Sequence, residues 1–156
     1  MDTKPRSPVG HVLAAGLVAG TCDIAYALAW SVAHGGTIER LLQAIASGWL
    51  GKAAFDGGAA TAALGLASHY AIVLVAAALF MLASRRLPWL RVHPCLAGAL
   101  YGLAIYGVMN VVVVPLSAAP FHLHYRLWST VGDVASHVFG VGLPISYITR
   151  RAFAER

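Results

Sequence analysis

The side chains best suited to proton or ligand chemistry lie inside long apolar stretches of this sequence. Asp133 and His137 are four residues apart, as are Tyr106 and Asn110, so each pair shares one face of a helix. A carboxyl group beside an imidazole can bind or transfer a proton, because histidine titrates near neutral pH and an acidic neighbour tunes it. The candidate polar site comprises Asp23, His69, Tyr106, Asn110, Asp133 and His137.

The composition indicates that membrane helices must position these side chains. Hydrophobic residues make up 59% of the 156 residues and charged residues 11%, with a mean hydropathy of +0.72. Soluble domains are usually about a quarter charged, so a soluble enzyme or a secreted disulfide scaffold is excluded. The net charge of +5 does not indicate a nucleic-acid partner, because the basic residues form short clusters between apolar stretches.

Four apolar stretches are long enough to cross a hydrocarbon layer of about 30 Å, which takes about 20 helical residues. They show none of the period-two alternation that a membrane barrel requires. We therefore predict an all-α integral membrane four-helix bundle that occupies residues 1–156 as a single domain. The predicted spans are residues 12–33, 58–82, 94–117 and 128–149.

The charges between the spans predict the orientation. With four spans, eight Lys and Arg residues fall on the side of the two termini, and Arg40, Lys52 and Arg126 fall on the other. Loops rich in Lys and Arg stay in the cytoplasm. Both termini are therefore predicted to be cytoplasmic, with the lipid bilayer as the surroundings of the chain.

The segment between the first two spans predicts an amphipathic helix over about residues 38–54. Thr37 is placed to cap it, and Glu39 in the first turn suits the helix dipole. We expect this helix to lie flat at the outer interface, with Trp49 at the level of the head groups, either as a connector or as a gate over a site. Its apolar face contains Ile38, Leu41, Leu42, Ile45, Trp49 and Leu50.

Small residues at four-residue steps predict close packing between helices, within one chain or between copies. If the stripes pack between copies of the chain, the protein forms a homo-oligomer. The stripes are Gly16/Gly20, Gly98/Gly102 and Gly132/Gly140, the last with Ser136 between.

The positions along each span predict that the polar side chains meet. Asp23, His69 and His137 lie within about 3 Å of mid-bilayer, and Asn110 and Asp133 about 7–8 Å nearer the outer face. An ionised Asp at a helix centre costs roughly 2.5–3.5 kcal/mol, so these groups should face the bundle interior. We expect an Asp133–His137 pair with Asn110 within reach of Asp133, and with Asp23 and His69 below.

Several motifs resemble the YagU-like family of bacterial inner-membrane proteins. They are GLVAG in the first span, RRLPWLRVHP after the second, LAGALYG and VVVVPLSAAP around the third, and GDVASHVFGVGLPISYITRR at the C-terminal end. The step from Asp133 to His137 carries the strongest part of the resemblance. The resemblance implies four helices and a bacterial inner membrane, and it supplies no established substrate.

The leading hypothesis is a polar-cored bundle that binds or relays a proton or a small polar solute. The alternative is a structural or partner-binding subunit without chemistry. Two further interpretations are a b-type haem between His69 and His137, and a divalent metal on His137, His69 and Asp133. The sequence has no nucleophile, nucleotide-binding or dinucleotide-binding motif, which favours a role without catalysis and with no cofactor.

Overall fold

The computed structural model describes residues 7–120 and 127–154, which are helical apart from short turns and contain no strand. The charged residues Lys4, Arg6, Arg126 and Arg156 lie outside these ranges. Four helical segments in the described chain are long and apolar enough to cross a membrane, which confirms the predicted fold class. They are Pro8–Ala33, Gly58–Arg86, Pro94–Leu116 and Trp128–Ala154.

The first two spans are uninterrupted α-helices, and the last two each contain a π-helical segment. Span one is α1 (Pro8–Ala33) and span two is α3 (Gly58–Arg86). Span three joins α5 (Pro94–Val108), the π-helix η2 (Met109–Val113) and α6 (Val114–Leu116). Span four joins α7 (Leu127–Ala135), the π-helix η3 (Ser136–Gly142) and α8 (Leu143–Ala154). The connecting elements are α2 (Ile38–Leu50), the 3₁₀-helix η1 (Gly51–Asp56) and α4 (Trp89–Val92).

Local sequence signals explain where the first helices begin and end. The Ser7 hydroxyl accepts a hydrogen bond from the Gly10 amide, and Pro8 occupies the first turn of α1, where its missing N–H is harmless. Gly35, at a φ of +83°, reverses the chain after α1. Thr37 then caps α2 by accepting a hydrogen bond from the Arg40 amide at 3.1 Å, as predicted.

The helix α2 packs against its neighbours with both apolar and polar side chains. Leu42 and Ala46 are buried, and Leu41 and Ile45 pack against the core. Gln43 and Ser47 are buried on α2, whereas Ile38 is 55% exposed and Trp49 70% exposed. Gln43 donates a hydrogen bond to the Gly58 carbonyl, and Ser47 donates one to its own helix. The buried polar groups are therefore satisfied, and the apolar side chains that stay exposed lie at the two ends of α2, as suits a helix beside hydrocarbon.

The indole of Trp49 donates a hydrogen bond to Ser68 Oγ at 3.1 Å. Ser68 lies ten residues into α3, which corresponds to about 15 Å along the helix. The position of Trp49 at head-group level stays a prediction. Because the indole nitrogen finds a protein partner on α3, it does not require water or a head group.

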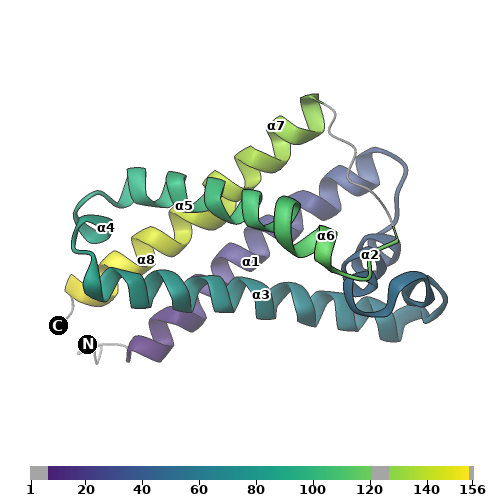
Figure 1. Ribbon diagram of the computed structural model, residues 1–156, viewed down its shortest axis with the longest axis horizontal. Helices are drawn as coiled ribbons and strands as arrows, with labels where there is room; N and C mark the ends of the chain where they lie inside the picture. The colour runs from purple at the N-terminus through teal and green to yellow at the C-terminus, as the bar shows by residue number, and fades with distance from the viewer. Residues whose placement is uncertain (1–6, 121–126, 155–156) are drawn as a thin grey trace, which may run out of the picture.

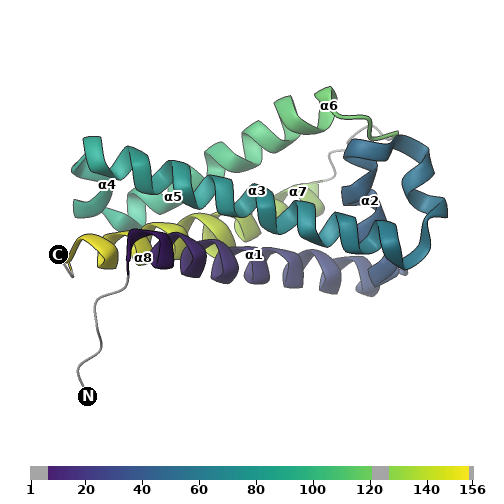
Figure 2. The same cartoon turned by 90° about the horizontal axis from the view of Figure 1, so that it is seen from below.

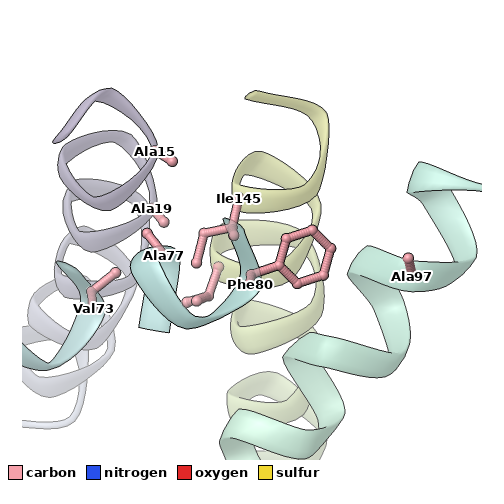
Figure 3. Close-up of a cluster of buried hydrophobic side chains, with 8 residues drawn as sticks. Ala15, Ala19, Val73, Ala77, Phe80, Ala97 and Ile145 are labelled. Carbon is pink, nitrogen blue, oxygen red and sulfur yellow. The ribbon is translucent and has the colours of Figure 1, made fainter. Parts of the chain in front are cut away.

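Alanine and branched side chains form the core between α1, α3, α5 and α8 (Figure 3). Ala15 and Ala19 of α1 face Ala77 of α3 and Ile145 of α8, and all four are almost fully buried. Phe80 fills the space toward α5, where its ring lies 4.8 Å from that of Tyr101. Small side chains on α1 allow the helices to approach closely, so that packing holds the bundle in lipid.

The predicted glycine stripes pack within this chain. Gly16 and Gly20 of α1 lie against Leu74 and Tyr70 of α3. Gly98 and Gly102 of α5 lie against the backbone of η3 and the start of α8, and Gly132 and Gly140 lie against Tyr26 and Cys22 of α1. An oligomer formed through these stripes stays a prediction, since each stripe already has a neighbour inside the monomer.

The two ends of the bundle differ in what they carry. The start of α1, the end of α8 and the short α4 lie at one end, and α2 lies at the other (Figures 1 and 2). An even number of spans returns the chain to the side from which it started. Arg85, Arg86 and Arg91 lie at the end that holds α4.

Candidate functional site

An acidic side chain from α1 meets two polar side chains from η3 inside the bundle. Ser136 Oγ donates a hydrogen bond to Asp23 Oδ1 at 2.7 Å. His137 Nδ1 lies 3.8 Å from the same oxygen, and the side chains of His137 and Asp23 are only 19% and 17% exposed. One carboxylate oxygen thus joins the first span to the fourth.

The local structure of the fourth span explains this arrangement. Ser136 and His137 are the first two residues of the π-helix η3. A π-helix has more residues per turn than an α-helix and occurs frequently at functional sites. Here it presents two consecutive side chains to Asp23. On the same helix, Gly140 has no side chain and lies close to Cys22 of α1, which lets the two backbones approach.

Two further polar groups extend this site toward the start of the fourth span. The Asp133 carboxyl interacts electrostatically with both His137 and Asp23. The Tyr26 hydroxyl lies against Gly132, where any side chain would collide with it. This hydroxyl is buried and has no hydrogen-bond partner among the described residues. We define Asp23, Tyr26, Asp133, Ser136 and His137 as the polar cluster.

The third span contributes an aromatic wall to the polar cluster. The ring of Tyr106 meets that of His137 edge to face, with centroids 5.5 Å apart. Asn110, in the π-helix η2, donates its amide hydrogen bond to the Tyr106 carbonyl at 2.8 Å on its own helix. Among the described residues no hydrogen bond joins Asn110 to Asp133, so the expected contact between them is not formed.

His69 lies beside the polar cluster rather than within it. Its Nε2 atom donates a hydrogen bond to the Gly20 carbonyl of α1 at 2.9 Å. Gly20 precedes Asp23 by three residues, about 4.5 Å along the helix. The ring of His69 also contacts that of Tyr70 edge to face. His69 therefore ties α3 to α1 about one turn closer to the start of α1 than Asp23.

The acidic partner of His137 differs from the predicted one. Its Nδ1 atom bonds the backbone carbonyl of Asp133 at 2.9 Å, not the Asp133 carboxyl. The carboxylate close to that nitrogen belongs to Asp23. The four-residue spacing places an imidazole over the carbonyl of the preceding turn as readily as over its side chain, so the spacing does not identify the partner.

Sequence reasoning missed Ser136 and Tyr26 as members of the polar cluster. Ser136 was recognised only as a small residue in a packing stripe. Tyr26 follows Asp23 by three residues and therefore shares its helix face, which was a usable signal. A serine or tyrosine hydroxyl in a span has many structural uses, so only its neighbours on other helices reveal membership of a site.

The positions of the His, Cys, Asp and Glu side chains do not favour the metal and haem interpretations. No group of three or more His, Cys, Asp or Glu side chains in residues 7–120 and 127–154 is arranged to hold a metal ion. His69, one of the two expected haem ligands, already uses its Nε2 atom in a hydrogen bond to the Gly20 carbonyl. The predicted set of His69, Asp133 and His137 therefore does not converge on one point in this part of the chain.

Comparisons with protein-family models, with characterised proteins and with solved structures find no match to this chain. The fold therefore defines its class, a four-helix membrane bundle with an additional amphipathic helix.

Proposed function

We propose that the polar cluster binds or relays a proton or a small polar solute inside the membrane. The observation that carries this proposal is the shared oxygen of Asp23, which accepts from Ser136 and faces the His137 imidazole at low exposure. A carboxylate that accepts from a hydroxyl and lies near an imidazole offers a binding site for a proton on its own oxygens, since His137 Nδ1 already donates to the Asp133 carbonyl. Ionisable side chains in membrane spans are rare and costly, and they commonly mark ion or proton pathways.

The Tyr26 hydroxyl, which has no hydrogen-bond partner among the described residues, favours a ligand bound at the polar cluster. A buried hydroxyl without a partner costs free energy, and the Tyr26 group lies beside Gly132 at the cluster. A water molecule, a protonated solute or a hydrated proton in contact with this oxygen would remove that cost. Two carboxyl groups in the same cluster favour a proton or a cation over an anion.

The proposal extends to the cellular setting. We infer that the chain resides in a bacterial inner membrane with both termini in the cytoplasm, as the charge bias and the YagU-like resemblance suggest. Membership of that family is supported only by the motifs quoted above.

Proton flux into liposomes tests the proposal. The purified chain is reconstituted with a pH-sensitive dye inside, and a potassium gradient with valinomycin drives protons across the bilayer. We expect the wild-type chain to acidify the lumen faster than protein-free vesicles do. Asp23→Asn and His137→Gln should reduce this flux to the protein-free level, because each removes a proton-binding group from the shared contact.

His34→Gln is the matched control. His34 Nδ1 bonds the carbonyl of Trp30 four residues earlier at 2.9 Å, as His137 does with Asp133, but His34 is exposed at the end of α1. Its replacement should leave the flux unchanged. Wild-type flux equal to that of empty vesicles would overturn the relay. Wild-type protein whose infrared spectrum shows no carboxyl group titrating with pH would overturn proton binding.

A purely structural role is the second candidate, and the Ser136–Asp23 hydrogen bond favours it. This bond links two spans that are 113 residues apart in sequence. If it serves only as a structural link, Ser136→Ala and Asp23→Asn will lower stability, and the wild-type chain will show neither flux nor a titrating carboxyl group. Stability and flux together therefore separate the two candidates.

A further inference from the structure

A second, apolar site lies between α2, α3 and the end of the third span. The structure contains a cavity of about 700 Å³ there, which falls within the range of small-molecule sites. Leu41, Ala44 and Ile45 of α2 form one wall, and Ile72 of α3 forms another. The third wall comes from η2, α6 and the residues that follow them. None of the members of the polar cluster lines this cavity.

The cavity exists because the third span diverges from α3. Figure 2 shows α6 leading away from α3, with α2 at the same end of the molecule. The π-helix η2 lies at the start of this divergence, and Pro115 follows it in α6. Both features bend helices. Met109 and Val113 of η2 therefore face α2 and α3 across a space instead of packing against them.

The polar atoms around this cavity are already paired. Ser68 Oγ donates to the Leu64 carbonyl and accepts from the Trp49 indole. Ser117 Oγ donates to the Val114 carbonyl and accepts from the Ala119 amide. A polar solute would thus find no free partner here, whereas an apolar chain needs none.

The surroundings of the cavity are also apolar. Trp49 and Leu116, which line it, are 70% and 82% exposed. Such large exposed apolar side chains at a membrane span face hydrocarbon. The cavity is therefore continuous with lipid rather than with water.

We propose that this cavity binds one acyl chain of a membrane phospholipid, which enters sideways from the bilayer. A cationic residue is placed for the head group: Gly51 lies against the Ala118 carbonyl at the cavity edge, and the next residue, Lys52, is exposed. Its ammonium group suits a lipid phosphate. This site is separate from the polar cluster, so either proposal can fail alone.

Native mass spectrometry of the full chain tests the site. The protein is released from detergent micelles after washing and is titrated with phosphatidylethanolamine. We expect one phospholipid to remain bound to the wild-type chain. Ala44→Phe should lower the bound fraction about tenfold, because the ring fills the wall of the cavity. A lysophospholipid, which has one chain, should compete.

Ala60→Phe is the matched control, because Ala60 is exposed on α3 and does not line the cavity. It should retain the lipid. A folded Ala44→Phe chain that binds lipid like the wild type would overturn the proposal. As a measurement that needs no variant, a phospholipid with a photoreactive acyl chain should label residues 41–49 and 109–119 above the other apolar surfaces. Uniform labelling along all spans would also overturn it.

Discussion

At the scale of single residues, the polar cluster depends on how each charged or hydroxyl group is satisfied away from water. Asp23 has a hydrogen bond from Ser136 and an imidazole nearby, whereas Tyr26 has no partner among the described residues. The polar cluster therefore contains a carboxylate that a protein group already satisfies and a hydroxyl that is left to bind a ligand. His69 already has a hydrogen-bond partner, the Gly20 carbonyl of another helix, so we assign it a structural role.

The Asp23–Ser136 contact should show energetic coupling. In a double-mutant cycle, Asp23→Asn and Ser136→Ala together should destabilise the chain by less than the sum of the single changes. We expect a coupling of about 1 kcal/mol, within the range found for hydrogen bonds between membrane helices. Unfolding in mixed micelles with dodecyl sulfate measures it. Ser117→Ala, whose hydroxyl bonds its own helix, should show no coupling to Asp23→Asn.

His69 should affect stability but not proton flux. His69→Leu removes the hydrogen bond to the Gly20 carbonyl and should cost about 0.5–1.5 kcal/mol of unfolding free energy. Flux into liposomes should stay at the wild-type rate, because His69 lies outside the polar cluster. A loss of flux comparable to that of His137→Gln, at unchanged stability, would instead place His69 on the relay.

At the scale of elements, glycine and π-helical geometry decide which helix faces meet. Gly98 and Gly102 allow the backbone of α5 to contact that of η3 directly. This close contact holds Tyr106 next to His137. On the other side of the third span, η2 and Pro115 create the apolar cavity. The third span therefore shapes both sites.

The α5–η3 contact predicts a difference between two glycines of the same helix. A methyl group at Gly102 would collide with the His137 carbonyl and lie 2.7 Å from the Val138 Cα, whereas one at Gly107 would meet nothing within 4 Å. Gly102→Ala should therefore destabilise the chain by about 1–3 kcal/mol. Gly107→Ala should be neutral or stabilise it by up to about 1 kcal/mol, since alanine favours helices. Equal unfolding curves for both variants would contradict the contact.

The docking of α2 on α3 should depend on Gly65. A side chain there would collide with the Leu42 carbonyl of α2. Gly65→Val should release α2, so that amide hydrogen exchange rises in residues 38–50 while the exchange of α1 and α8 stays at the wild-type rate. The bound phospholipid should be lost as well, because α2 forms a wall of the cavity. Unchanged exchange in α2 would show that other contacts hold it.

At the scale of the whole molecule, four spans give the bundle two chemically different ends. Among the described residues, the end with α4 carries five arginines and the end with α2 carries Arg40 and Lys52; the five are Arg85, Arg86, Arg91, Arg150 and Arg151. Cationic residues near short loops are retained in the cytoplasm. The bundle is therefore expected to insert with α4 inside the cell and α2 outside.

Labelling with a membrane-impermeant maleimide checks this orientation. Cys22 and Cys95 are free cysteines and are first replaced by serine. A cysteine introduced at Lys52 should then react in intact cells, and one introduced at Arg86 should react only after the membrane is opened. Both positions are exposed. The reverse pattern would invert the inferred topology, and reaction of both in intact cells would contradict four spans.

The sequence alone determined the number and place of the membrane helices, because twenty apolar residues in a row have few alternatives in lipid. It also determined the cap at Thr37 and the inward position of the ionisable groups, through the cost of charge in hydrocarbon. The actual span ends differ modestly, since α3 continues to Arg86 and α8 to Ala154 beyond the apolar stretch.

Only the tertiary structure decided which side chains meet. The spacing along one helix suggested Asp133 as the partner of His137, but the partner carboxylate comes from Asp23 on another helix. Helix rotation, the π-helical turn at Ser136 and the close approach at Gly140 set that contact, and each depends on packing between spans. The apolar cavity beside α2 arises for the same reason, because hydropathy along the chain does not specify which neighbour covers each face.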